Sequence, residues 1–390
     1  MIDQAVIFCG GFGTRLLPLT KKIPKPMVKL DNKPFLFHLI MQCKSNGINN
    51  FLILCGYKAK IIEKYFGNGS RLGVKIKYHY NPPHVQTLKR LIDANKLLTE
   101  RFLLMYSDNY SDLNLHQLKE KFIKFKSSFL LSICKKKKGN VLINTSKKKL
   151  RKYYFKKNNK SNYVEIGYMI IKKKILPKYI SDSTVSFNSF INTQTNKNKI
   201  NYFINENNYI SISDKKRFLK AKEYFNNKPI LVDRDGVLNL KSKSHYYIRN
   251  KTELEINFKF LKRYGKLLKK KKVFCITNQA GIATGDLTKK NLNLINKEIK
   301  KSLKKQNIQI VDFFVSPHHF KSKHIDRKPG NGLFLKAVKK YKFLLDRSIY
   351  IGDDIRDIEA SYNAKCKCIY IGKEKLNTKE KNKYKYILTK

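Results

Sequence analysis

Short apolar runs alternate with amphipathic stretches over the first hundred residues, and this rhythm constrains the fold more than any other feature. The runs at 5–9, 50–55 and 102–106 have the length and composition of buried strands. Between them, residues 34–46 and 58–66 have the apolar spacing of helices. Alternating strands and helices predict a mainly parallel, doubly wound sheet. The same rhythm adds a strand at 74–80 and a helix at 89–98.

A second series of the same kind begins at residues 230–232, directly after a polar stop at 226–229 that ends in proline. A helix expected at 215–225 closes the first series. The chain has 390 residues and 42% hydrophobic content, which is enough for two cores. We therefore predict an α/β protein with two doubly wound, Rossmann-like domains at residues 1–226 and 229–372, followed by a charged segment at 373–390.

The formal charge of +56 comes from 84 Lys and Arg against 28 Asp and Glu. So strong a positive field attracts polyanions, and nucleic acid is one candidate. The lysines are spread along the whole chain, however, without the Arg-rich or aromatic clusters of base recognition. Abundant Lys, Asn, Ile, Tyr and Phe is also the product expected from an AT-rich coding sequence. We expect no specific nucleic-acid partner, and the field remains available to anionic small substrates.

The sequence predicts no membrane span, because its longest apolar runs fall far short of about 20 residues. The amino terminus runs straight into a strand pattern, so no secretory signal is expected. Seven cysteines without a C-x-x-C pair predict reduced thiols in a cytoplasmic protein. Cys366 and Cys368 lie in a strand-like run and are expected in the core. No sequence feature specifies an oligomeric state.

Polar side chains follow several strands of the second series. Because ligands bind at the carboxyl ends of parallel strands, we expect these groups at one site. There, one carboxylate can attack phosphorus while a second moves the proton, and hydroxyl and ammonium groups hold the phosphoryl oxygens. Mg²⁺ between the carboxylates would offset their repulsion, so the set predicts phosphoryl transfer. The residues are Asp233 and Asp235 after 230–232, Thr277, Lys328, and the acidic cluster of Asp353, Asp354 and Asp357.

This ordered set of Asp-x-Asp-Gly, strand-end Thr, Lys and Gly-Asp-Asp resembles the haloacid dehalogenase superfamily of phosphatases. The resemblance implies that Asp233 is the nucleophile that forms an aspartyl-phosphate, and that Asp235 is the general acid and base. Thr277 and Lys328 would bind the phosphoryl group. Mg²⁺ would be held by Asp233, the Asp235 carbonyl and Asp353.

Flanking runs narrow the resemblance to D-glycero-D-manno-heptose 1,7-bisphosphate 7-phosphatases and the related histidinol-phosphate phosphatases. These runs are Asp-Arg-Asp-Gly-Val-Leu-Asn from 233, Thr-Asn-Gln-Ala-Gly-Ile-Ala from 277, and Arg-Lys-Pro from 327. The resemblance implies that Asn278 and Arg327 contact substrate. Arg327 would bind the phosphate left on the sugar, because a guanidinium suits that geometry.

Many members of this group carry a zinc loop of cysteine and histidine ligands before the Arg-Lys-Pro run. The corresponding positions here are Ser316, His318, His324 and Asp326, without any cysteine. Closed zinc sites prefer thiolate ligands, so a His/His/Asp site would be weak, and we expect no zinc.

A glycine-rich loop directly follows the first strand and is followed by a Pro-Lys-Pro-Met run. Closely spaced glycines let backbone N–H groups approach a polyphosphate, and nearby cations add charge. The residues concerned are Gly10, Gly11, Gly13, Thr14, Arg15 and Lys25.

The whole pattern, G-G-x-G-T-R-L-x-P-L-T with P-K-P-M, closely resembles the sugar-1-phosphate nucleotidyltransferases over roughly residues 2–225. The resemblance implies that the glycines, Thr14 and Arg15 bind a nucleoside triphosphate and that Lys25 stabilises the transition state. Asp108 falls at the strand-end position of a Mg²⁺ ligand. Glu165 falls near the sugar-binding segment.

Three departures from that family pattern bear on activity. Residues 85–90 have bulky side chains where the family has a glycine-rich loop, and Ser107 replaces a glycine before Asp108. The second metal carboxylate, expected near 209–213, corresponds to Ser211. A hydroxyl does not supply the charge that a carboxylate gives Mg²⁺. Transfer is therefore either active, with another acid, or lost in a degenerate binding domain.

We predict a two-domain enzyme of nucleotide-activated heptose biosynthesis with sugar phosphate and nucleoside triphosphate substrates. The second domain would remove the 7-phosphate of a heptose bisphosphate, and the first would charge the anomeric phosphate of the product with a nucleotide. One alternative is a phosphatase alone, acting on histidinol phosphate or another phosphate monoester. Another is a basic nucleic-acid-binding protein on an inactive scaffold, against which the intact acidic set argues, because its carboxylates would repel a phosphate backbone.

Overall fold

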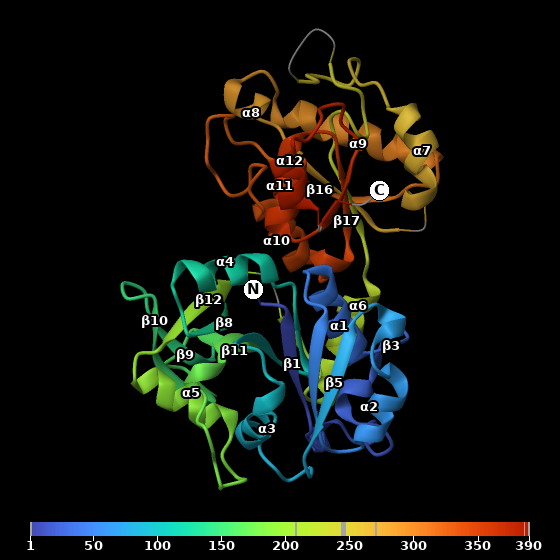
Figure 1. Ribbon diagram of the computed structural model, residues 1–390. Coiled ribbons are helices and arrows are strands. Elements are labelled where there is room, and N and C mark those ends of the chain that lie inside the picture. The colour runs from blue at the N-terminus through green and yellow to red at the C-terminus, as the bar shows by residue number, and fades with distance from the viewer. Residues whose placement is uncertain (1, 207–208, 243–246, 270, 386, 389–390) are drawn as a thin grey trace. The chain divides into compact units, whose positions relative to one another are not determined.

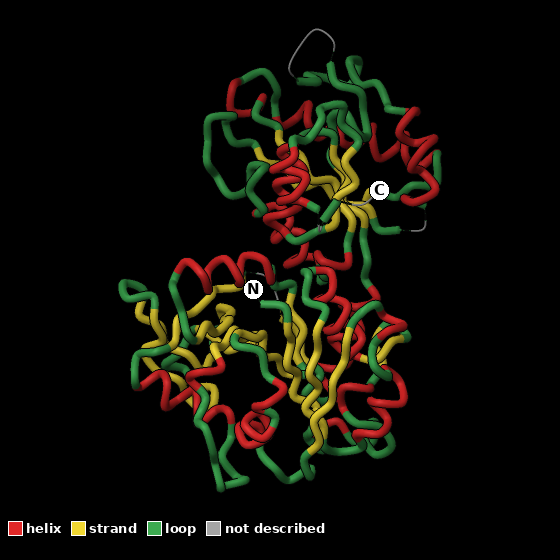
Figure 2. The backbone as a smooth tube through the Cα atoms, viewed as in Figure 1, coloured by secondary structure: helices red, strands yellow, loops and turns green. Residues whose placement is uncertain are grey.

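The computed structural model describes residues 2–206, 209–242, 247–269, 271–385 and 387–388. It divides into two compact units, Met1–Lys222 and Glu223–Lys390. Within each unit the strands gather at the centre and the helices lie around them, as Figure 2 shows. This arrangement confirms the predicted α/β class. Among the described residues, none of the helices has the length and apolar character needed to cross a membrane.

The first unit is built on a nine-stranded sheet within the described residues. The four strands β5, β4, β1 and β6 are parallel, as the alternating pattern predicts. The second half of the sheet is mixed, because β11 runs antiparallel to β6, β8 and β9, whereas β12 runs parallel to β8. In sheet order the strands are β5 (Lys75–Tyr80), β4 (Asn50–Cys55), β1 (Gln4–Cys9), β6 (Arg101–Tyr106), β11 (Tyr163–Lys172), β8 (Phe129–Lys135), β12 (Ile200–Asn205), β10 (Lys149–Asn158) and β9 (Gly139–Asn144).

Helices flank this sheet (Figure 1). The predicted helix at 89–98 begins earlier, at Thr87, and ends at Asp93, where the chain tightens into a 3-10 turn at Asn95–Leu97. Two short ribbons, β2 (Lys29–Leu30) with β3 (Lys33–Pro34) and β7 (Asn109–Ser111) with β13 (Tyr209–Ser211), complete the unit. The helices are α1 (Phe35–Ser45), α2 (Ala59–Phe66), α3 (Thr87–Asp93), α4 (Leu115–Lys124) and α5 (Phe187–Asn196), followed by α6 (Lys215–Asn226).

One face of this sheet packs on α3 and α5. Alternate side chains of β1 and β4, such as Phe8 and Leu54, join Leu88, Phe187 and Phe190 in a single buried cluster. Successive strand residues point to opposite faces, so the near-continuous apolar runs supply both layers of the core.

The second unit has a parallel five-stranded sheet among its described residues, with β14 at its centre. The predicted strand at 230–232 is β14, and its carboxyl end leads directly into Asp233. In sheet order the strands are β16 (Ile310–Ser316), β15 (Val273–Asn278), β14 (Ile230–Val232), β17 (Ile349–Gly352) and β18 (Lys367–Tyr370).

Helices cover both faces of this second sheet, as a doubly wound fold requires. Val232 points into a cluster with α7 and α9, and its neighbour Leu231 points into one with α10 and α11. Cys366 and Cys368 are fully buried, as predicted. The helices are α7 (Phe258–Leu268), α8 (Gly281–Thr284), α9 (Lys289–Lys305), α10 (Gly332–Tyr341), α11 (Ile355–Ala364) and, in the charged terminal segment, α12 (Thr378–Tyr384).

Candidate functional sites

The carboxyl ends of β14 and β17 bring Asp233, Lys328 and Asp357 together. Lys328 Nζ lies 2.9 Å from Asp233 Oδ1 and 2.7 Å from Asp357 Oδ1, and only 4% of its side chain is exposed. Burial by itself lowers the pKa of Lys328, but the two carboxylates raise it by more. The pKa therefore lies above its ordinary value, and the ammonium stays protonated. Burial raises the pKa of Asp233 to about 7, although Lys328 opposes the shift and favours the ionised form that a nucleophile needs.

Asp357 is a site residue to which the sequence pattern assigned no role. One of its oxygens contacts Lys328, and the other accepts the backbone N–H groups of Asp353 and Asp354 at 3.1 Å each. A Cβ at Gly352 would lie 2.4 Å from the Asp357 side chain, so a glycine is needed there. Asp357 therefore orients Lys328 and the turn that carries Asp353.

Asp235 is held by a buried network rather than by Lys328. Arg234, which is fully buried, donates to Asp235 at 3.0 Å, and Gln279 and Asn239 donate at 2.7 and 2.9 Å. Burial raises the pKa of Asp235, but Arg234 and these hydrogen bonds outweigh it, and the pKa lies below its ordinary value. Gln279 also donates to Thr277 Oγ1 at 2.9 Å, which links the second carboxylate to the predicted phosphoryl-binding hydroxyl.

Oxygen ligands for Mg²⁺ converge at the same strand ends. One oxygen each from Asp233, Asp353 and Asp357 lies within 4.8 Å of the others. Asp353 Oδ1 is buried and receives no hydrogen bond from the described residues, whereas Asp353 Oδ2 lies 2.6 Å from Lys241 Nζ. A buried carboxylate oxygen without a donor fits a hard cation. The residues present therefore suit Mg²⁺, with Asp233 and Asp353 as carboxylate ligands.

The two predicted substrate residues of this unit lie beside Lys328. The Asn278 amide donates to the Lys328 carbonyl at 3.1 Å and accepts its N–H at 3.0 Å, so it holds the Lys328 backbone. Arg327 is 9% exposed, and its Nη1 donates to the His318 carbonyl at 3.4 Å. Burial lowers the pKa of Arg327, and the nearby Arg356 lowers it further, as expected for a cation short of anionic partners.

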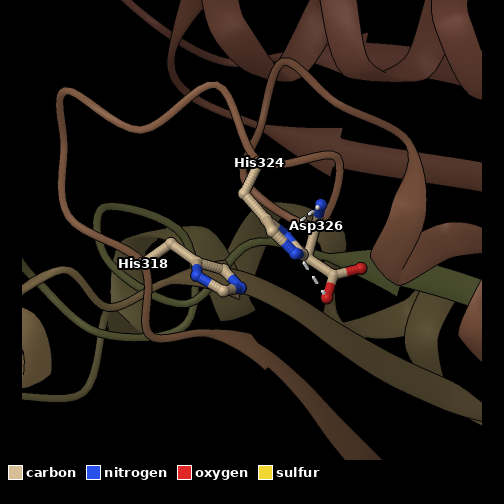
Figure 3. Close-up of side chains that lie close together, drawn as sticks. All are labelled: His318, His324 and Asp326. Carbon is tan, nitrogen blue, oxygen red and sulfur yellow. Dashed lines mark hydrogen bonds and ion pairs between the residues drawn. The ribbon is translucent and has the colours of Figure 1, made fainter.

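His318, His324 and Asp326 come together in the loop before Lys328, at positions where many of the resembled phosphatases have zinc ligands. Figure 3 shows the two imidazoles side by side, and their ring centroids are 3.6 Å apart. His324 Nδ1 lies 3.7 Å from Asp326 Oδ2, which also forms an ion pair with Lys336. Ser316 is fully buried at the end of β16. The aspartate is thus already paired with a cation.

We expect the purified protein to contain far less than one zinc per chain. The cluster offers no thiolate, and Lys336 competes for the Asp326 carboxylate. Elemental analysis after purification without chelators checks this. Stoichiometric zinc that is lost in His324→Ala and retained in His116→Ala, a helix-surface histidine, would contradict it.

The first unit contains a cavity of about 450 Å³ that opens beside the ends of β6 and β11. Three predicted residues line it, Arg15, Asp108 and Glu165. Lys25 lies next to it, with Nζ 3.0 Å from Asp108 Oδ2, so a predicted catalytic cation and a predicted metal ligand form an ion pair. Ser211 also lines the cavity. The Asp108 carboxylate is an oxygen ligand of the kind that a divalent cation prefers.

The glycine loop that precedes Arg15 depends on a buried arginine. A Cβ at Gly10 would lie 2.4 Å from the Arg90 guanidinium, which donates to the carbonyls of Cys55 at 2.6 Å and Pro82 at 2.7 Å. Arg90 belongs to the bulky segment 85–90, so one side chain of this segment has a structural role beside the loop. Gly11 and Thr14 are exposed, and Gly13 has a left-handed φ of 70°.

Glu165 lies at an irregularity where β11 leaves register with β8. It accepts the N–H of Gly167, whose φ of 80° and close approach to Tyr106 require glycine. Burial raises the pKa of Glu165 to about 8, although the Gly167 hydrogen bond opposes the shift. This pKa favours the neutral form of Glu165 at pH 7, a property that the sequence does not reveal.

Two further cations line the same cavity, Lys157 on β10 and Arg217 on α6. Burial lowers the pKa of Lys157, and the charges of Lys136 and Arg217 lower it further. Neither Lys157 nor Arg217 was predicted, because lysine and arginine are too frequent along this chain to mark a site.

Comparisons with known families match the two units separately. The nucleotidyl transferase family model matches residues 4–184, and the haloacid dehalogenase-like hydrolase model matches residues 278–371. The second match begins at Asn278, so Asp233, Asp235 and Thr277 lie outside it.

Curated relatives resemble the first unit. A D-glycero-alpha-D-manno-heptose 1-phosphate guanylyltransferase from Campylobacter jejuni is 35% identical over 116 residues, which is 30% of this chain and 52% of the relative. One of the same name from Aneurinibacillus thermoaerophilus is 32% identical over 131 residues, 33% of this chain and 56% of the relative. The chain thus matches about half the length of these relatives.

A solved structure has the same fold as the first unit. HddC from Yersinia pseudotuberculosis, complexed with GMP-PN, aligns with 57% of this chain and 100% of its own, at 23% identity and a TM-score of 0.51. The chain therefore carries an amino-terminal nucleotidyltransferase domain, with heptose 1-phosphate guanylyltransferases among its relatives, and a carboxyl-terminal haloacid dehalogenase-like hydrolase domain.

Proposed function

We propose that this chain performs two successive steps in the synthesis of a nucleotide-activated heptose. Residues 229–372 would hydrolyse the 7-phosphate of D-glycero-D-manno-heptose 1,7-bisphosphate. Residues 1–226 would then transfer a nucleotide to the anomeric phosphate that remains. The observation that carries the proposal is the buried Asp233, Lys328 and Asp357 set in a chain whose other domain has heptose 1-phosphate guanylyltransferases as relatives.

In the phosphatase step, an Asp233 oxygen attacks phosphorus, and the bond from phosphorus to the sugar oxygen breaks. Asp235 donates a proton to the leaving oxygen and then accepts one from the water that attacks the aspartyl-phosphate. Orthophosphate leaves and the Asp233 carboxylate is restored. Thr277 and Lys328 hold the phosphoryl oxygens, and Arg327 binds the second phosphate. Because Asp235 is ionised in its network with Arg234, it must take up a proton before the first step.

In the transfer step, an oxygen of the sugar 1-phosphate attacks the α-phosphorus of the nucleotide, and the bond to the bridging oxygen breaks to release pyrophosphate. The triphosphate would be held by Gly10, Gly11, Gly13, Thr14 and Arg15. Lys25 would stabilise the charge that develops at the α-phosphate. Mg²⁺ would neutralise phosphate charge in both domains, bound by Asp108 in the first and by Asp233, the Asp235 carbonyl and Asp353 in the second.

Ser211 and the bulky 85–90 segment favour a second candidate, a phosphatase whose first domain only binds ligand. Its substrate would be histidinol phosphate or another phosphate monoester. The two candidates differ in one product, the nucleotide-sugar diphosphate.

Phosphorus NMR distinguishes them. The protein is incubated with heptose 1,7-bisphosphate, Mg²⁺ and a mixture of GTP, ATP and CTP. Orthophosphate followed by a nucleotide-sugar diphosphate signal supports the two-step proposal and identifies which nucleotide is transferred. Orthophosphate without that signal supports the phosphatase alone. Absence of orthophosphate overturns the heptose bisphosphate assignment, and other phosphate monoesters are then screened.

Ionisation of Glu165 is expected to weaken sugar 1-phosphate binding above pH 8. With a pKa of about 8, the carboxyl is neutral below that pH and negative above it, where it loses its donor proton and repels phosphate. Affinity should fall by up to about 10-fold per pH unit, and Glu165→Gln should remove this dependence. Isothermal titration from pH 6.5 to 9.5 checks it, with exposed Glu223→Gln as the control. Parallel pH profiles in the wild type and Glu165→Gln would refute it.

A further inference from the structure

The position predicted for a second metal carboxylate is occupied by a serine that hydrogen-bonds within the protein. Ser211 Oγ donates to Ser213 Oγ at 2.9 Å, and Arg217 Nη1 donates to the same oxygen at 2.6 Å. Both serines are at most 9% exposed. The Ser211 hydroxyl is therefore part of a short chain of hydrogen bonds that ends on the Arg217 guanidinium.

Two further contacts hold Arg217 at the start of α6. Its backbone N–H donates to Asp214 Oδ1 at 2.9 Å, and its Nε lies 3.3 Å from Asp214 Oδ2. Within the described part of the chain, no acceptor contacts Nη2. Arg217 lines the same cavity as Asp108 and Arg15, so its remaining donor is available to a ligand there. A planar guanidinium fixed by two partners is preorganised to bind phosphate oxygens.

The balance of charge in this cavity also favours an anion. Asp108 is paired with Lys25 at 3.0 Å, and the pKa of Glu165, raised by burial to about 8, leaves that residue neutral at pH 7. Arg15 and Lys157 contribute positive charge, and the Arg217 guanidinium adds a charge that Asp214, 3.3 Å away, offsets in part. Arg217 is near enough to lower the pKa of Lys157, after the larger effect of burial, so the two cations act on the same volume.

We propose that Arg217 binds phosphate oxygens of the substrates in the amino-terminal cavity, with Ser213 and Ser211 as its positioning residues. Its fixed charge takes the place of the charge that a second divalent cation would bring to a carboxylate at position 211. The inference deepens the proposed nucleotidyl transfer and depends on it. The chemistry recognised is a phosphate group, either on the nucleoside triphosphate or on the sugar 1-phosphate.

Isothermal titration of the full chain tests this proposal, with GTP and heptose 1-phosphate titrated separately, each with and without Mg²⁺. A charged hydrogen bond of this kind corresponds to about 10- to 100-fold in affinity. The affinity of Arg217→Gln for at least one ligand should fall by this factor, and the affinity of Arg217→Lys should fall less. Ser213→Ala, which keeps the charge and removes the support, should lose an intermediate amount. Arg101→Gln, at the opposite end of β6, should bind like the wild type.

The outcomes distinguish a failure of this inference from a failure of the proposed nucleotidyl transfer. Weaker GTP binding in Arg217→Gln assigns the contact to the nucleotide, and weaker heptose 1-phosphate binding assigns it to the sugar phosphate. If the wild type binds both ligands and Arg217→Gln binds them equally well, the inference is wrong and the proposed transfer stands. If the wild type binds neither, both fail. Circular dichroism melting of each variant shows that a loss of affinity is not a loss of folding.

Discussion

Replacing Asp233 with asparagine is expected to reduce orthophosphate release from heptose bisphosphate by at least about 1000-fold, or about 4 kcal/mol of transition-state stabilisation. The amide keeps the shape of the side chain and a carbonyl oxygen for Lys328, which lies 2.9 Å from the carboxylate. It lacks the anionic oxygen that attacks phosphorus. Binding of substrate should change far less than turnover, because Thr277, Lys328 and Arg327 remain.

Single-turnover phosphate release measures this effect. Asp286→Asn, an exposed aspartate of the same domain, serves as the matched control and should behave as the wild type. In the same preparation, the transfer step supplied directly with heptose 1-phosphate and nucleotide should be unaffected. Phosphatase activity of Asp233→Asn within 10-fold of the wild type would exclude Asp233 as the nucleophile.

Replacing Lys328 with methionine should destabilise the second domain by about 3–5 kcal/mol in addition to abolishing phosphatase activity. The Lys328 side chain is 4% exposed, and its ammonium lies within 2.9 Å of Asp233, Asp357 and the Tyr350 hydroxyl. Methionine fills the volume but leaves two buried carboxylates without a cation. An uncompensated buried charge costs more than an exposed one, because the protein interior solvates it poorly.

The loss of stability in Lys328→Met should depend on pH. Lys328 is the group that lowers the pKa of Asp233, so without it burial raises that pKa further. A carboxyl whose pKa is higher in the folded than in the unfolded state destabilises the folded protein as pH rises above the unfolded pKa of about 3.9. The deficit relative to the wild type should therefore be larger at pH 8 than at pH 5, where protonation relieves it.

Calorimetric melting of the full chain at both pH values checks this prediction. Adding Asp233→Asn to Lys328→Met should restore part of the stability, because it removes one unpaired charge. Lys339→Met, at an exposed position of α10, is the control and should melt as the wild type. An equal loss in the two lysine variants would show that the buried contacts do not stabilise the domain.

Local patterns were sufficient to predict the strands that carry the chemistry. The run at 50–55 is β4 and the run at 230–232 is β14, because buried parallel strands are short, continuous apolar segments between turn signals. Parallel strands present their carboxyl ends at one edge, so Asp233, Thr277 and Asp353 could be assigned to one site before any contact was known. The mixed half of the first sheet was not predicted, because buried strands have similar apolar sequences whether they pair in parallel or antiparallel.

The partners of the charged groups depend on contacts between residues far apart in the chain. Asp235 and Gln279 lie at two different strand ends, and Lys25 in a 3-10 turn contacts Asp108 after a strand; neither pair has a spacing that periodicity detects. Among 84 basic residues, Lys328 differs from the rest through its burial and its carboxylate partners, and Arg217 through the cavity and the serine that it contacts. Motif order is thus enough to name the two domain families and to propose the residues that react. The protonation of Glu165, the orientation of Lys328 by Asp357 and the positive charge of the first cavity follow from desolvation and distance, which exist only once the chain has folded.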